Sequence, residues 1–212
     1  MRAVLIPTTL AVLSFGQPVP ASPKGFQETS LLAGSLSETA MVVPSGSNMT
    51  GNFASDHRSF YVFDIPQFSR PVAQARLVFD AGRGFKRFGD DATRTIGIWN
   101  FSGDADLLVP GQPCVPSCAA VFDDLGTGTL LSTQTIVIPG PAAPMPEVVF
   151  DLDATARGLI ADVGNAGGGR FAVGAEIDAS NTLQPLEGIW TNSSGNDAAR
   201  LVVTLVPESD GT

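Results

Sequence analysis

Three side chains in this sequence combine a flat apolar ring with a polar edge, and therefore suit stacking against a sugar ring: Trp99, Trp190 and Tyr61. Trp99 alternates with Ile96 and Ile98, so it faces water if the two isoleucines face a core. Trp190 stands beside a polar loop that offers hydrogen-bond partners for hydroxyl groups. All three rings are candidate ligand-binding residues, with packing in a core or at a sheet edge as the alternative.

One basic cluster, Arg83, Lys86 and Arg87, stands in a segment bounded by glycines. The whole chain is acidic: of its 212 residues, 21 are Asp or Glu and 12 are Lys or Arg, which gives a formal net charge of −9. Nucleic acid is therefore a poor partner, because phosphate recognition needs clustered positive charge. The basic cluster would suit an acidic polysaccharide, and a solvated hairpin is the alternative.

The sequence contains few of the residue combinations that catalysis requires. His57 is the only histidine, so any nucleophilic triad would require it, and we expect it in a solvated loop before a strand. A glycoside hydrolase needs two carboxyl groups that converge on one cleft, which neighbouring acids along a chain do not establish. Acids in turns leave open a structural Ca²⁺, with turn and helix-capping roles as the alternative, and we expect no other cofactor. The paired acids are Asp90, Asp91, Asp104, Asp106, Asp123, Asp124, Asp151 and Asp153.

Cys114 and Cys118 are the only cysteines and stand in a proline-rich segment that can turn. In an oxidising compartment two thiols this close are expected to form a disulfide, which pins a local loop rather than the whole fold. A redox pair or half of a metal site is the alternative. Asn48, Asn100 and Asn192 match the pattern for N-glycosylation, which has meaning only in a eukaryotic host.

Residues 1–21 have the organisation of a secretory signal peptide. A mostly apolar run follows Met1 and Arg2, and small residues precede an expected cleavage site between Ala21 and Ser22. We therefore expect a secreted protein, extracellular or periplasmic, with a buried N-terminal element as the alternative. No other stretch has the roughly 18 apolar residues that a membrane span requires, so we expect no transmembrane segment in the mature chain.

The candidate residues belong to short segments of alternating apolar and polar residues, separated by Gly, Pro, Asn and Asp. In residues 59–65 both faces are apolar, as in a strand in the middle of a sheet. About nine such strands predict an all-β, antiparallel, jelly-roll-like β-sandwich. We expect one domain, residues 22–206, and a polar tail, residues 207–212. The predicted strands are 59–65, 72–80, 95–101, 118–122, 134–138, 147–152, 170–177, 186–190 and 200–206.

One segment, residues 154–163, has apolar residues at helical spacing instead. Asp153 can cap its first turn, and Gly164 or Asn165 can adopt the left-handed conformation that ends a helix. The pattern predicts one short helix packed on the sandwich. The glycine-rich turn that follows comes after a helix rather than opening one, so it does not match a phosphate-binding loop.

The order of these segments resembles secreted bacterial β-sandwich proteins. It is similar to DNRLRE-type jelly-roll modules and, more closely, to exported proteins of the PEP-CTERM type. At the C-terminal end, Val206-Pro-Glu-Ser is similar to the start of a Val-Pro-Glu-Pro sorting motif, but Ser209 replaces the second proline. The resemblance implies a released protein, and some jelly-roll relatives act as carbohydrate-binding modules. The segments that carry it are 58–65, 72–79, 122–128, 149–156, 170–175 and 200–205.

Together these features predict a secreted, non-catalytic β-sandwich module that binds an extracellular polysaccharide. The basic cluster would supply charge and an exposed tryptophan would supply stacking. The alternative is a structural or matrix protein that assembles with copies of itself or with a cell-envelope partner. A polysaccharide hydrolase or lyase is a third hypothesis, and the sequence leaves the oligomeric state open.

Overall fold

The computed structural model describes most of the chain from Lys24 onward. The predicted signal peptide lies outside the described residues, as do Arg83, the Asp90 and Asp91 pair, and Asn192. In the part of the chain that is described, no helix is both long enough and apolar enough to cross a membrane. The described residues are 24–36, 41–42, 48–52, 56–81, 85–87, 92–108, 114, 116–140, 142–144, 146–177, 188–191 and 199–208.

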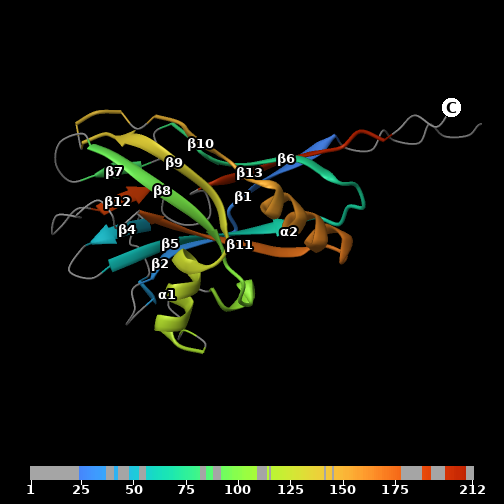
Figure 1. The fold of residues 1–212 in the computed structure, drawn as a ribbon, viewed down its shortest axis with the longest axis horizontal. Coiled ribbons are helices and arrows are strands. Elements are labelled where there is room, and N and C mark those ends of the chain that lie inside the picture. Colours follow the sequence, from blue (N-terminus) through green and yellow to red (C-terminus); the bar gives the residue numbers. More distant parts are fainter. Residues whose placement is uncertain are drawn as a thin grey trace, which may run out of the picture.

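Two antiparallel sheets form the molecule (Figure 1). The smaller sheet has the order β1 (Gly25–Thr29), β13 (Arg200–Leu205), β6 (Val72–Phe79) and β10 (Val148–Asp151). In the larger sheet, β2 (Leu32–Leu36) also pairs with β5 and with β3 (Met41–Val42). The order of its other strands is β7 (Phe85–Arg87), β12 (Gly188–Thr191), β4 (Asn48–Asn52), β5 (Asp56–Ile65), β11 (Gly169–Ile177), β8 (Ala92–Asn100) and β9 (Leu130–Ile138).

The predicted all-β, sandwich-like class is confirmed, although the described residues form thirteen strands rather than about nine. The additional strands are short, and their sequences lack the alternation that marks a half-buried strand. β1 reads GFQET, β4 reads NMTGN and β7 reads FKR. These segments adopt a strand conformation because hydrogen bonds to neighbouring strands satisfy their backbone N–H and C=O groups.

The main core lies between the two sheets and contains large aromatic side chains from both. β5 runs through the middle of the larger sheet and buries both of its faces, as its sequence predicted. Tyr61 and Phe63 face the main core, where Phe79 of β6 packs edge-on against Tyr61 with ring centroids 5.2 Å apart. Phe60 and Val62, on the other face, belong to a second apolar cluster.

That second cluster lies under a helix, α1 (Cys118–Thr127), which packs on the outer face of the larger sheet (Figure 1). The strand predicted at 118–122 is therefore wrong, as is the expectation of one helix. The Ser117 side chain accepts a hydrogen bond from the Ala120 N–H at 3.2 Å and begins the helix. Val121, Phe122 and Leu125 are buried, and their spacing is helical.

The predicted helix at 154–163 is present as α2 (Ala154–Asn165), packed against β6, β11 and β5. Asp153 caps it as predicted, because its Oδ1 accepts a hydrogen bond from Ala156 N at 2.9 Å. Gly164 does not end the helix. It lies inside the helix, where the Phe68 ring occupies the space that a Cβ would need. The left-handed turn comes later, at Gly167, whose φ is 108°.

Candidate ligand-binding site

Trp99 lies on the outer face of the larger sheet. Ile96 and Ile98 of the same strand are fully buried in the main core, whereas Trp99 is partly exposed. Its indole lies over Gly97: a Cβ on this glycine would be 2.7 Å from the indole Nε1 and 3.3 Å from Cε2. Nε1 is buried and has no hydrogen-bond partner among the described residues. The glycine therefore provides the space in which the ring rests against the strand.

Around this ring the surface is hollowed by a groove of about 470 Å³, here called the Trp99 groove. Its walls come from β8, β9, β11 and the end of α1. They combine an aromatic ring, threonine hydroxyls and one carboxylate, which are the groups that recognise a polyhydroxylated ring. The lining residues are Thr95, Gly97, Trp99, Gly126, Thr127, Leu130, Thr133 and Glu176.

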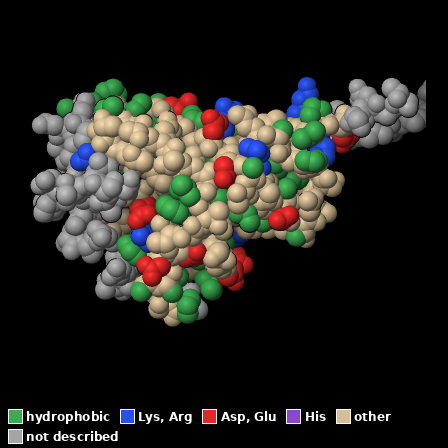
Figure 2. Space-filling view, in the orientation of Figure 1, with side chains coloured by type: hydrophobic (Ala, Val, Ile, Leu, Met, Phe, Trp, Pro, Cys, Tyr) green, Lys and Arg blue, Asp and Glu red, His purple; other side chains and the backbone are tan. Residues whose placement is uncertain are grey.

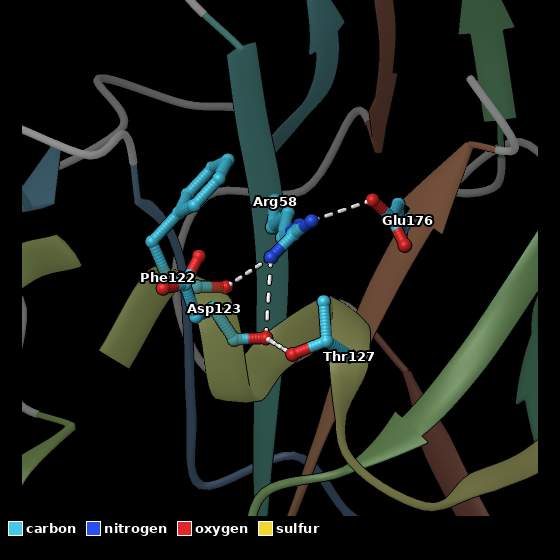
Figure 3. A network of polar contacts seen from close by, with 5 residues as sticks. All are labelled: Arg58, Phe122, Asp123, Thr127 and Glu176. Carbon is cyan, nitrogen blue, oxygen red and sulfur yellow. Dashed lines mark hydrogen bonds and ion pairs between the residues drawn. The ribbon is translucent and has the colours of Figure 1, made fainter. Parts of the chain in front are cut away.

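The carboxylate of the groove, Glu176, is held by Arg58 of β5 (Figure 3). Arg58 Nη2 donates to Glu176 Oε1 at 2.7 Å, and Nη1 donates to the carbonyl oxygens of Phe122 at 2.5 Å and Asp123 at 3.2 Å. The guanidinium carbon also stands 4.1 Å from the centroid of the Phe122 ring. The side chain of Arg58 is 11% exposed and that of Glu176 is 23% exposed. A nearly buried arginine therefore joins strand β5, helix α1 and the groove.

Two glycines allow α1 to approach this closely. A Cβ on Gly126 would collide with Arg58 Nε and would stand 2.8 Å from Glu176 Oε2. A Cβ on Gly174 of β11 would collide with the carbonyl of Leu125. The wall that α1 contributes is thus fixed by backbone-to-backbone contact and by the Arg58 network.

A second and larger hollow, of about 1000 Å³, lies between α2, the end of β5 and the loop that follows β8. We call it the Arg170 cleft. Arg170 Nη1 stands 2.5 Å from Asp106 Oδ1, and its Nε stands 3.6 Å from Asp64 Oδ1. Asp104 and Asp162 also line the cleft. The sequence did not predict this cleft. Its walls come from segments that are far apart in the chain, and no local pattern indicates that they lie side by side.

Of the other predicted ligand-binding residues, Arg83 lies outside the described part of the chain, as do the side chains of Lys86, Arg87 and Trp190. Tyr61 is a correction: its ring is fully buried in the main core, so it cannot stack on a ligand. Both faces of β5 are buried, as the apolar residues on both faces of 59–65 predicted, and this burial includes Tyr61. Trp190 and Lys86 are brought together as register partners of β12 and β7, with Arg87 opposite Ile189. Of the described residues that line the Trp99 groove, none is a predicted basic residue.

Asp104 caps a turn, whereas Asp124 stands in α1 and binds the loop that follows β8. Asp104 accepts a hydrogen bond from Asp106 N at 2.9 Å, and Asp124 accepts one from Ser102 N at 2.7 Å. Within the described ranges, no three His, Cys, Asp or Glu side chains are grouped as a metal ion would require. His57 is buried within β5, so its expected place in a solvated loop is wrong.

The predicted disulfide is present. Cys114 and Cys118 are bonded, with their Cα atoms 4.7 Å apart. Cys118 is the first residue of α1, so the bridge ties the preceding loop to the start of that helix. The opposite end of the same helix, at Gly126 and Thr127, lines the Trp99 groove.

The fold and site define a class: an all-β, sandwich-like protein with a groove beside Trp99 on the outer face of its larger sheet. No protein-family model matches the chain, and no curated protein matches it either. The resemblance to DNRLRE-type and PEP-CTERM-type proteins therefore stays a prediction.

Proposed function

We propose that this protein, secreted after removal of residues 1–21, binds an extracellular polysaccharide without converting it, and does so at the Trp99 groove. One observation carries the proposal: a tryptophan ring held over Gly97 on an outer sheet face, beside threonine hydroxyls and a fixed carboxylate. An indole face stacks on the apolar face of a sugar ring, while hydroxyls and a carboxylate bind its hydroxyl groups.

The arrangement is also prepared in advance. Glu176 is held by Arg58, and Arg58 is held by two backbone carbonyls, so little side-chain freedom is lost when a ligand binds. The Trp99 indole lies against Gly97, and its partly exposed ring belongs to the groove lining. A site of this kind supports binding more readily than catalysis, because the described residues of its lining include one carboxylate rather than two.

Retention of the full chain on polysaccharide gels tests the proposal. Trp99→Ala is expected to weaken retention by about 2 kcal/mol, or a factor of about thirty, as for other central aromatic anchors. Trp99→Phe keeps a ring over Gly97 and should keep part of the affinity. Trp190→Ala is the matched control at the other predicted tryptophan. Failure of every polysaccharide to retain the unaltered chain would overturn the proposal.

The non-catalytic part of the proposal has its own readout. Prolonged incubation of the chain with each polysaccharide that it retains should release no new reducing ends and no unsaturated sugars. Release of either product at a rate proportional to protein concentration would instead support the hydrolase or lyase hypothesis.

The assembly alternative has one observation of its own. β9 ends the larger sheet in the described chain, and its nine residues, LLSTQTIVI, contain no charge and no proline. Natural edge strands usually carry such residues to prevent pairing with another chain. If the protein assembles through this edge, sedimentation will show concentration-dependent oligomers, and Gln134→Lys, at an exposed position of β9, will return them to monomers.

A further inference from the structure

The charge of the Trp99 groove restricts the class of polysaccharide that it can take. Glu176 is the one charged residue among the described residues that line the groove. The cation beside it, Arg58, is committed to Glu176 and to two backbone carbonyls, and its side chain is nearly buried. Among the described residues that line the groove, a ligand carboxylate would therefore meet the carboxylate of Glu176 and no uncommitted arginine or lysine.

The charge of the whole molecule acts in the same direction. The chain carries a formal net charge of −9. On the face shown in Figure 2, acidic side chains are spread over the described surface rather than confined to one end. At low ionic strength this net charge opposes the approach of an acidic polymer.

The groove continues as a strip along two paired strands. Trp99 pairs with Leu130, Gly97 with Thr133, and Thr95 with Thr135. The hydroxyl groups of Thr95 and Thr135 are 2.8 Å apart and exposed to solvent. From Trp99 to Thr95 a strand advances about 14 Å, at about 3.4 Å a residue. A surface of this length suits several linked sugar rings rather than one.

From these observations we infer that the Trp99 groove takes a linear stretch of an uncharged polysaccharide, and that it discriminates against uronate polymers. This inference rests on the proposed function and differs from the prediction that the basic cluster recruits an acidic polysaccharide, which stays untested. Threonine hydroxyls both donate and accept hydrogen bonds, and the Glu176 carboxylate accepts them, so together they match the hydroxyl groups of neutral sugars.

Calorimetry on the full chain tests the inference with defined probes: cello-, xylo- and mannohexaose as neutral chains, and the hexamer of galacturonic acid as the acidic one. At least one neutral hexamer should bind about tenfold more tightly than the uronate hexamer. Its affinity should be nearly the same at about 50 mM and about 500 mM salt, since screening does not affect an uncharged ligand. The matching disaccharide should bind about tenfold more weakly, because it fills only part of the strip.

A charge-adding variant separates this inference from a general effect of net charge. Thr133→Lys places a cation in the groove and should raise uronate affinity about tenfold, with Thr204→Lys on β13 of the other sheet as the matched control. The inference is wrong if the uronate hexamer binds the unaltered chain as tightly as every neutral hexamer and Trp99→Ala abolishes that binding. In that case the proposed function survives. If no hexamer or polymer binds at all, the proposed function fails.

Discussion

The Trp99 groove and the Arg170 cleft each place an arginine against carboxylates, but they hold these charges in different ways. Arg58 and Glu176 are 11% and 23% exposed, and Arg58 also donates to two carbonyls of α1. Arg170 is 34% exposed, and its partners Asp106 and Asp64 are 68% and 62% exposed. The cleft is about twice as large as the groove, at about 1000 Å³ against about 470 Å³.

This contrast argues that volume alone is a poor guide to a binding site here. In the groove, every polar wall residue stands on a strand or at the end of a packed helix, and glycines set the contacts. In the cleft, ion pairs between exposed side chains span a loop and two element ends. Exposed ion pairs of that kind are screened and contribute little to rigidity. The Trp99 groove is therefore held more rigidly for binding a ligand than the larger Arg170 cleft.

Replacing Arg58 with Met should produce the largest change. The substitution removes the ion pair between Arg58 and Glu176 and two hydrogen bonds to the carbonyls of α1. Removal of one member of a largely buried ion pair costs about 3 kcal/mol or somewhat more. Guanidinium unfolding, monitored without reductant so that the disulfide persists, should show this loss in the free energy of unfolding.

Arg58→Lys provides the control for charge alone. Lysine keeps the positive charge, but it cannot reach Glu176 and two carbonyls at once with a planar fork. It should recover about a third of the lost stability or more, because the carboxylate regains a cation. If Arg58→Met lowers the free energy of unfolding by less than about 1 kcal/mol, the Arg58–Glu176 pair contributes no more than an exposed ion pair. It would then not differ from the Arg170 pairs.

Gly174→Ala tests the second element that holds the groove wall. The new Cβ would collide with the Leu125 carbonyl, and because this is backbone, α1 must move away from β11. Such overpacking should cost about 2 kcal/mol of unfolding free energy. The matched control is Gly158→Ala, at an exposed position of α2 with no atom within 4 Å of the new Cβ. It should stabilise the protein by about 0.5 to 1 kcal/mol in the same denaturation experiment.

Gly97→Ala alters the groove itself and should lower the free energy of unfolding by only about 1 kcal/mol. The new Cβ displaces the Trp99 indole, so retention on polysaccharide should fall more than stability does. In a Trp99→Ala background the obstacle is gone, and the alanine should then cost almost nothing. Additive losses in this double-mutant cycle would show that the ring does not rest on Gly97.

The spacing of apolar residues along the chain predicted most of the long strands and one of the two α-helices. β6 and β13 were found because their apolar residues alternate, β5 because its apolar residues cover both faces, and α2 because Asp153 caps a helical stripe. Helix α1 was taken for a strand because a five-residue apolar window does not distinguish the two, and its helical continuation to Leu125 had to be considered as well.

The candidate site was predictable only in part. Trp99 could be found because Ile96 and Ile98 fix its phase in β8. Glu176 could not, because the Arg58 that holds it lies 118 residues earlier and no short-range signal links them. The Arg170 cleft was missed for the same reason. Contacts between distant segments depend on how sheets and helices pack, which a single sequence does not display.

Arg170→Ala should produce the smallest change and thereby sharpen the contrast with Arg58. Its ion pairs with Asp106 and Asp64 are exposed, so their loss should lower the free energy of unfolding by less than about 1 kcal/mol. The effect should shrink further in high salt, because screening weakens exposed pairs. Retention on polysaccharide should stay at the level of the unaltered chain, since Arg170 does not line the Trp99 groove. A loss of retention comparable to that of Trp99→Ala would move the binding site to the cleft.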